Sequence, residues 1–196
     1  MNTLSSQPLP YPNRPILKWL FRLPILLYRL GLGPIAGRLF MILTTTGRQS
    51  ALPRRHAIKF HSFAGRKYVF SAWGNKADWY RNVQAEPRVT VQTADGVESL
   101  RARRVTSDDD LAQAFRAFEN NAILKSWVKT IGLPLTLEAL LAHRDQLFFV
   151  TFDPTDDPAP PPLPIDLKWV WLPVAGLVVL AGVQLSRLGP RLRRNC

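Results

Sequence analysis

Cysteine is almost absent from this sequence. The single cysteine is Cys196, so the chain can form no internal disulfide and no metal site built from several cysteines. Histidine is also scarce, and His56, His61 and His143 have neither the spacing of metal ligands nor a His-Glu-x-x-His motif. The sequence therefore predicts no metal centre.

Acidic residues are few in comparison with basic ones. The 196 residues include 26 Lys and Arg against 14 Asp and Glu, which gives a formal net charge of +12. Such a charge attracts anionic lipid, nucleic acid or an anionic cofactor. Because no helix-turn-helix, zinc-finger or RRM-type signature occurs, we expect no nucleic-acid partner. Anionic lipid and an anionic cofactor remain as the expected partners of this positive charge.

The length suits one domain with appendages. Residues 1–15 are rich in Pro, Ser and Asn, which predicts a disordered N-terminus. Residues 39–152 form the predicted folded domain. Residues 153–166 contain six prolines and four aspartates, which predicts an extended linker, and residues 187–196 form a basic tail.

Two apolar segments flank this domain. Residues 16–38 are basic and hydrophobic but interrupted by Pro24, so we expect them to lie in a membrane interface; a helix folded over the domain is the alternative. Residues 167–186 carry one charge, Lys168, at their edge, with Trp169 and Trp171 nearby, which predicts a transmembrane helix.

Two arguments predict opposite orientations in the membrane. The positive-inside rule places the arginine-rich C-terminal tail in the cytoplasm. The absence of an export signal and the affinity of basic segments for an anionic inner leaflet favour a cytoplasmic domain. We expect a membrane-anchored protein whose folded domain is cytoplasmic.

Residues 39–152 are patterned as short strands with interposed helices. Strands are predicted at 39–46, 54–62, 66–73, 88–93, 97–105 and 146–152, and helices at 76–85, 107–120 and 134–143. Ala94-Asp95-Gly96 is a strong signal for a tight hairpin. This pattern predicts an α+β fold built on a small, partly opened barrel, with residues 122–133 as a connecting piece.

The stretch 43–82 contains the chemistry. A β-prone run ends at Gly47-Arg48-Gln49-Ser50, and the next strand carries Arg54, Arg55 and His56. Glycine allows close approach of the backbone, and the donors around it suit a phosphate or carboxylate. A third strand then leads through Trp73-Gly74 into a helix, whose free N–H groups also favour negative charge. The aromatic residues beside it favour a planar, anionic ligand.

These motifs resemble the deazaflavin-dependent nitroreductase family, which includes quinone reductases using coenzyme F420. The similarity rests on Thr-Thr-x-Gly-Arg-x-Ser, the basic strand and Trp-Tyr-x-Asn. Many members have Lys at the position of Gln49, Gly at that of Ala51 and a longer loop after Trp73. The resemblance implies a split β-barrel that holds the phosphate and glutamyl tail on the Gly-Arg loop and the deazaflavin ring near residues 71–79.

The resemblance implies a hydride transfer from reduced F420 to a quinone such as menaquinone or another lipid-soluble acceptor, and it leaves a dimer open. An FMN enzyme on the same fold and a non-catalytic membrane-tethered carrier or sensor remain alternatives. His56 and Tyr80 are the candidate proton donors. The residues expected at the cofactor are Arg48, Ser50, Arg54, Arg55, Ser71, Ala72, Trp73, Gly74, Asp78, Trp79 and Asn82.

Overall fold

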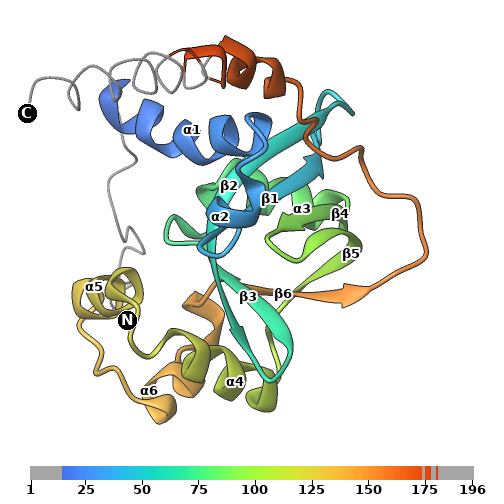
Figure 1. The fold of residues 1–196 in the computed structure, drawn as a ribbon. Helices are drawn as coiled ribbons and strands as arrows, with labels where there is room; N and C mark the ends of the chain where they lie inside the picture. Colours follow the sequence, from blue (N-terminus) through green and yellow to red (C-terminus); the bar gives the residue numbers. More distant parts are fainter. Residues whose placement is uncertain (1–14, 174, 178–179, 181–196) are drawn as a thin grey trace, which may run out of the picture.

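The computed structural model describes residues 15–173, 175–177 and 180, with side chains from Arg22 onward, and its centre is a closed barrel of six antiparallel strands (Figure 1). Around the barrel the strands follow the order β1-β2-β3-β6-β5-β4. Their bounds are β1 Phe40–Thr46, β2 Pro53–Phe63, β3 Arg66–Phe70, β4 Arg88–Thr93, β5 Gly96–Arg104 and β6 Phe149–Pro154. The predicted barrel with flanking helices is thus confirmed.

Strand alternation decides which side chains fill the barrel. Met41 and Leu43 of β1 point inward, while Ile42 between them points outward. The hairpin between β2 and β3 turns at Ala64 and Gly65, whose φ angles are 51° and 77°. The predicted Asp-Gly hairpin lies between β4 and β5, where Gly96 has a φ of 132°.

One mouth of the barrel is closed by the helix α3, Asp78–Ala85. Trp79, Tyr80 and Val83 of this helix join the side chains of the barrel interior in one buried cluster. A single 3-10 turn, η1 (Gly74–Lys76), leads into α3 from the end of β3. The helix is therefore a plug held by its own apolar face.

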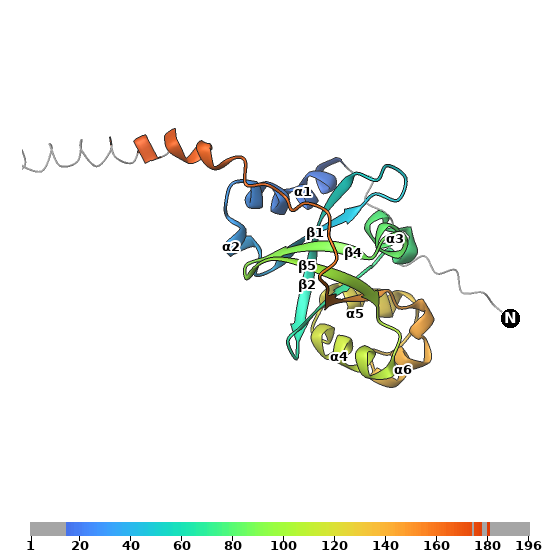
Figure 2. The ribbon, with the colours of Figure 1, turned by 90° about the vertical axis from the view of Figure 1, so that its right-hand side faces the viewer.

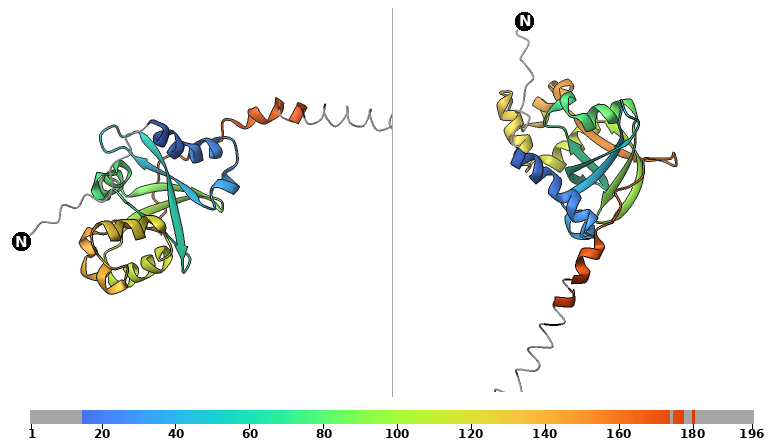
Figure 3. Two further views of the ribbon diagram at one scale, coloured as in Figure 1. Left: turned by 90° about the vertical axis from the view of Figure 1, so that its left-hand side faces the viewer. Right: turned by 90° about the horizontal axis from the view of Figure 1, so that it is seen from above.

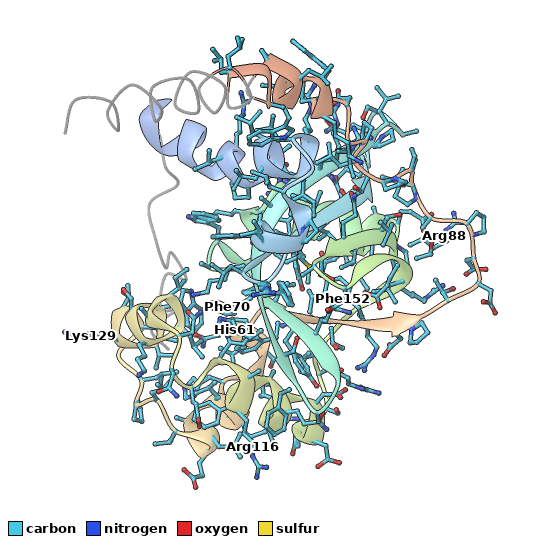
Figure 4. All side chains as sticks on the ribbon, in the orientation of Figure 1. His61, Phe70, Arg88, Arg116, Lys129 and Phe152 are labelled. Atoms are coloured by element: carbon cyan, nitrogen blue, oxygen red, sulfur yellow. The ribbon has the colours of Figure 1, made fainter. Side chains whose placement is uncertain are left out.

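A second cluster lies outside the barrel beneath three helices, which we call the helical layer: α4 (Asp108–Phe118), α5 (Ala122–Thr130) and α6 (Leu137–Ala142). A one-turn helix, η2 (Arg144–Gln146), follows α6. Ser107 caps α4, accepting a hydrogen bond from the Asp110 amide at 3.2 Å. His61 and Phe70 lie where the barrel meets this layer (Figure 4).

The connecting piece predicted at 122–133 is instead mostly helix. Asn121 caps α5 by accepting hydrogen bonds from the amides of Ile123 and Leu124 at 2.8 and 3.0 Å. Trp127 is buried edge-on against Phe70, with ring centroids 5.4 Å apart. The segment is part of the core, because this helix has an apolar face and the barrel offers a surface to cover.

The N-terminal helices α1 (Pro15–Arg29) and α2 (Gly33–Ala36) lie across the outer face of β1. Tyr28 is buried there, its hydroxyl 2.9 Å from the carbonyl oxygens of both Phe40 and Gln92. This is the arrangement of a helix folded over the domain. Leu26, Ile35 and Leu39 nevertheless remain exposed on this side of the molecule.

The proline-rich segment predicted as a linker is bonded to the barrel wall. We call residues 155–167 the strap; they contain no helix or strand. Gln92 of β4 binds both backbone groups of Leu163, donating to its carbonyl at 3.1 Å and accepting from its amide at 2.6 Å. Near the end of the strap, Arg29 holds Asp166 through two bonds of 2.8 and 2.7 Å.

The short helix η3 (Lys168–Val170) follows the strap, and the indole of Trp171 donates to the Leu30 carbonyl at 2.8 Å. The helical layer and this segment lie on opposite sides of the barrel (Figures 2 and 3). Within the described residues, no helix is both long and apolar enough to cross a membrane. Much of the predicted transmembrane helix at 167–186 lies outside the described residues, as do residues 1–14 and the basic tail at 187–196.

Candidate functional site

The loop between β1 and β2 gathers donors at the mouth of the barrel. Its ends meet through a hydrogen bond of 2.9 Å from the Gly47 amide to the Leu52 carbonyl. A side chain at Gly47 would lie 2.7 Å from the Ser50 hydroxyl oxygen and 3.2 Å from Cγ of Arg54, so glycine leaves room for both side chains beside the loop. The tight loop places Ser50 against Arg54, whose guanidinium donates to the hydroxyl at 3.1 Å.

Arg48 fastens the same loop to α3. Its guanidinium donates to Oδ1 of Asn82 and to Oδ1 of Asp78, each at 3.1 Å, and its amide also reaches Asn82 at 3.2 Å. Asn82 is buried and donates in turn to the Thr45 hydroxyl at 3.2 Å. We call Arg48, Ser50, Arg54, Asp78 and Asn82 the anion cluster.

The helix residue Asp78 does not cap α3. The N-cap is Ala77, which makes no side-chain hydrogen bond, and Asp78 is the first helical residue. Its carboxylate lies beside the helix N-terminus, where negative charge is favoured, and pairs with Arg48. Trp79 is buried in the barrel interior, so it supports the helix from within.

Strand alternation separates two of the arginines expected to act together. The β1–β2 register pairs Thr45 with Arg54 and Thr44 with Arg55, so Arg54 faces the mouth and Arg55 the outer wall. There the Arg55 guanidinium donates to the Pro162 carbonyl of the strap at 3.3 Å. The structure therefore does not bring Arg55 into the anion cluster.

His56 shares the inward face of β2 with Arg54. Its Nε2 atom is buried, with no hydrogen-bond partner among the described residues. Burial lowers the pKa of His56 below its ordinary value of 6.5; Asp78 opposes this effect and Arg54 adds to it. The imidazole is thus neutral at pH 7 and can accept or donate one hydrogen bond to a ligand, but it is a weak source of protons.

Residues 71–74, which we call the ring loop, join β3 to η1. The Ser71 hydroxyl donates to the Gly74 carbonyl at 2.8 Å, which fixes the turn. Gly74 has a φ of 56°, and a side chain there would lie 2.9 Å from the Phe148 ring. Ala72 packs toward the helical layer, whereas Trp73 packs against the barrel interior. The backbone of the ring loop therefore lies next to the aromatic rings of Trp73 and Phe148.

Tyr80, the other candidate proton donor, lies on a different side of α3 from the anion cluster. It is 1% exposed, and its hydroxyl accepts a hydrogen bond of 3.1 Å from Gln84. Burial raises the pKa of Tyr80 above its ordinary value of 10.0, so the phenol keeps its proton at pH 7. The structure therefore separates the two candidates, with Tyr80 near Phe148 and His56 near Arg54.

Three residues near the mouth were not singled out from the sequence: Gln84, Arg104 and Phe148. Phe148 contacts both Tyr80 and Arg104, with centroid distances of 5.5 Å to the Tyr80 ring and 5.2 Å to the guanidinium carbon. The helical spacing of Tyr80 and Gln84 was a readable signal. The approach of Arg104 and Phe148 was not, since it depends on the pairing of β5 with β6.

Among the described residues, no group of three or more His, Cys, Asp or Glu side chains could hold a metal ion. The mouth instead offers basic and hydroxyl donors on one flank of α3 and an aromatic surface near the ring loop. This combination defines a class of small barrels suited to a planar, anionic organic cofactor.

The chain belongs to the F420H(2)-dependent quinone reductase family, whose model matches residues 20–136, more than half of the sequence. It is accordingly an oxidoreductase, and its cofactor is coenzyme F420.

Several solved structures are similar to this chain. An F420-H2 dependent reductase (FDR-A) is 24% identical, with a TM-score of 0.45, and the match covers 59% of this chain and 93% of that one. A heme-binding protein from Mycobacterium smegmatis is 13% identical, with a TM-score of 0.43 and coverage of 65% and 50%. A FAD-binding protein from Mesorhizobium loti is 16% identical, with a TM-score of 0.41 and coverage of 66% and 89%.

The residues at the mouth fit the coenzyme. Its phosphate and acidic tail require donors, and the guanidinium of Arg54 is exposed with Ser50 as its only hydrogen-bond partner among the described residues. The unpartnered Nε2 atom of His56 lies on the same inward face. No carboxylate pairs with Arg54 within the described part of the chain, so its charge is available to an anionic ligand.

Proposed function

We propose that this enzyme reduces a quinone or another lipid-soluble, electron-poor acceptor at the expense of reduced F420. The observation that carries the proposal is the anion cluster at the barrel mouth, in a chain that belongs to a family of F420H(2)-dependent quinone reductases. The coenzyme supplies two electrons as a hydride. The protein's own tasks are binding, orientation and the handling of protons.

In this proposal Ser50 and Arg54 bind the phosphate and acidic tail, and Arg48 contributes the N–H groups that Asn82 and Asp78 do not use. The ring loop lines the edge of the deazaflavin ring through Ser71, Ala72, Trp73 and Gly74. Asp78, Trp79 and Asn82 hold α3, the element on which both halves rest. Arg55 has a different task, because it binds the strap.

Tyr80 is the better proton donor of the two candidates. A group that protonates a reduced acceptor at pH 7 must hold a proton at that pH. Burial favours the protonated phenol of Tyr80, whereas it favours the neutral imidazole of His56. His56 is then a hydrogen-bonding group for the bound coenzyme.

We further propose that the protein is anchored to a membrane by residues 167–186, with the barrel in the cytoplasm and menaquinone as a fitting acceptor. The support is the apolar sequence of that segment and a set of exposed apolar side chains on the same side of the barrel as α1. Trp169, Leu172 and Leu177 are 63%, 73% and 68% exposed. Aromatic and leucine side chains of this kind partition into a lipid interface.

The decisive experiment titrates the full chain with oxidised F420 and follows the fluorescence of the coenzyme. Arg54→Gln should weaken binding by about 10- to 100-fold, because a hydrogen bond to a charged group contributes about 1.5–3 kcal/mol. Arg55→Gln is the matched control, one residue away on the opposite face of β2, and should bind normally. Equal losses in both variants, or none in either, would contradict the proposed coenzyme site.

The acceptor is tested separately, with the full chain reconstituted in vesicles. Oxidation of reduced F420 should be faster with a menaquinone analogue dissolved in the vesicles than with a water-soluble quinone of the same potential, since a shared membrane raises the local concentration of both partners. A preference for the soluble quinone would contradict the membrane part of the proposal and leave the coenzyme site untouched.

A further inference from the structure

The plug helix α3 has different neighbours on its two flanks. Asp78 and Asn82 face the loop between β1 and β2, where the anion cluster lies. On the flank toward β5 and β6 there is a cavity of about 460 Å³. Its lining consists of Tyr80, Val83, Gln84, Pro87, Ala102, Arg104 and Val150. We call it the Arg104 cavity; no residue proposed to bind the coenzyme lines it.

Arg104 is a cation that lacks an anion. One terminal nitrogen donates to the backbone carbonyls of Asp145 and Leu147 at 2.9 and 3.2 Å, but these groups carry no net charge. Its Nε atom is buried and has no hydrogen-bond partner among the described residues. Within the described part of the chain, no carboxylate forms an ion pair with it.

Arg103, the residue before it, has the same side chain but very different partners. Arg103 points to the outer face of β5, where it bonds to Asp110 at 2.8 Å and to Asp153 at 2.9 Å. Arg104 points to the inner face with Ala102, which lies in the barrel interior. A half-buried guanidinium that is left without a counter-charge beside an open cavity is the arrangement that an anionic ligand completes.

The other walls of the cavity define the shape of that ligand. The Tyr80 hydroxyl accepts from Gln84, which leaves its own hydrogen free to donate into the cavity. Val83, Ala102 and Val150 supply apolar surface, and Arg104 lies over the Phe148 ring. One charged group, one hydroxyl donor and apolar walls suit a molecule with a flat hydrocarbon body and a single negatively charged oxygen group.

We propose that the Arg104 cavity binds a small aromatic oxyanion, that is, a carboxylate or a phenolate on a planar apolar body. Arg104 binds the charged oxygen, Tyr80 donates a second hydrogen bond to it, and the apolar walls enclose the ring. The site does not depend on the coenzyme. On the proposed function, a hydroquinone anion, which a quinone becomes on accepting a hydride, belongs to the same chemical class.

The test follows the fluorescence anisotropy of 2-naphthoate added to the full chain without coenzyme. Arg104→Gln should weaken binding by more than about tenfold, the effect of losing a charged hydrogen bond. Gln84→Glu, a change at an exposed helix position, adds a negative charge to the lining and replaces the donor to the Tyr80 hydroxyl with an acceptor that competes for its hydrogen, so it should weaken binding similarly. Arg101→Gln, on the same strand but exposed, is the matched control and should bind normally.

Two further probes separate the possible sources of the negative charge. Neutral 2-naphthamide should bind far more weakly than 2-naphthoate, and γ-glutamylglutamate, which has the chemistry of the coenzyme tail, should not compete. The proposal is overturned if naphthoate does not bind, if Gln84→Glu leaves its affinity unchanged, or if the amide binds equally well. Binding of the diglutamate in preference to naphthoate would instead assign the cavity to the coenzyme tail. Because no coenzyme is present, these outcomes are independent of the F420 titration.

Discussion

The inner rim of the barrel mouth and the outer face of its wall treat positive charge in opposite ways. On the outer face Arg103 and Arg66 both pair with the Asp110 carboxylate, at 2.8 and 3.3 Å. On the inner rim Arg54 meets a serine hydroxyl and Arg104 meets backbone carbonyls. Arg48, which fastens the loop to α3, is paired with Asp78, whereas the two charges that we propose serve a ligand, those of Arg54 and Arg104, have no carboxylate partner among the described residues.

The largest effect is expected at Gly74, where the rim depends on backbone shape. Gly74→Ala should lower the free energy of unfolding by about 2–4 kcal/mol, since the new methyl group meets the Phe148 ring and a positive φ disfavours alanine. Denaturant unfolding measures the loss. Gly65→Ala also has a positive φ but meets nothing within 4 Å, so it should cost only about 1 kcal/mol; equal costs would mean that contact with Phe148 does not matter.

Replacement of the adjacent arginines of β5 tests the comparison directly. Arg103→Met should cost about 1 kcal/mol of stability, because two partly exposed ion pairs are lost and solvent screens both. Arg104→Met should cost less than about 0.5 kcal/mol, since an uncompensated charge is removed from a half-buried position. Urea unfolding of both variants decides the matter; a larger loss for Arg104→Met would show that its carbonyl contacts support the fold.

Within the anion cluster, Arg48 and Arg54 should likewise differ in how much they contribute to stability. Arg48→Gln should lower stability by about 1 kcal/mol, because the guanidinium connects the loop to Asn82 and Asp78. Arg54→Gln should change it by less than about 0.5 kcal/mol, as only the bond to Ser50 is lost. Thermal unfolding in the absence of coenzyme provides the measurement, and a reversed order would assign the structural role to Arg54.

The outer face should also show a specific dependence on pH. The hydrogen bond from Arg103 lowers the pKa of Asp110 below its ordinary value of 3.8. Its contribution to stability is therefore fully present above about pH 4 and is lost as the pH falls through the lower value of the folded protein. Carboxyl NMR titration of the wild type and of Arg103→Met should show the Asp110 pKa rising in the variant; an unchanged pKa would exclude Arg103 as the cause.

The smallest effect is expected at Ala51, where the resemblance to related reductases pointed to a glycine. Ala51 has a φ of 54°, a conformation that costs a non-glycine residue about 1–2 kcal/mol. Ala51→Gly removes this strain but loosens the unfolded chain, so the net gain should be about 0.5 kcal/mol. A calorimetric melting curve can resolve it, and a lower melting temperature would mean that the loop is not strained.

Local signals in the sequence predicted much of the fold. The Asp-Gly hairpin before Val97 lies where it was expected, and the first five strands begin within one residue of their predicted starts. The strand predicted at 146–152 instead begins at Phe149, because residues 144–146 form η2. The helix α5 carries a similar local signal in its Asn121 cap. The strap was not predictable in this way, because Gln92 and Leu163 are 71 positions apart and meet only after the barrel has closed.

The residues of the site were largely predictable, but their distribution over the two faces of β2 and the two flanks of α3 was not. The sequence grouped Arg54 with Arg55, although alternation along a strand sends neighbours to opposite faces. Arg48, Asp78 and Asn82 were expected near the cofactor, and the structure brings them together through hydrogen bonds between residues 30 and 34 positions apart. The Arg104 cavity needs three elements, α3, β5 and β6, and no short motif describes it.

The strap also has a mechanical consequence. It is fastened to β4 through Gln92, to β2 through Arg55 and to α1 through Asp166. A force applied to the C-terminal part of the chain would therefore strain several hydrogen bonds along the barrel wall at the same time. The strap would not simply extend like a flexible linker. Residues 168–171, which the Trp171 indole fastens to the Leu30 carbonyl, would then move together with the barrel.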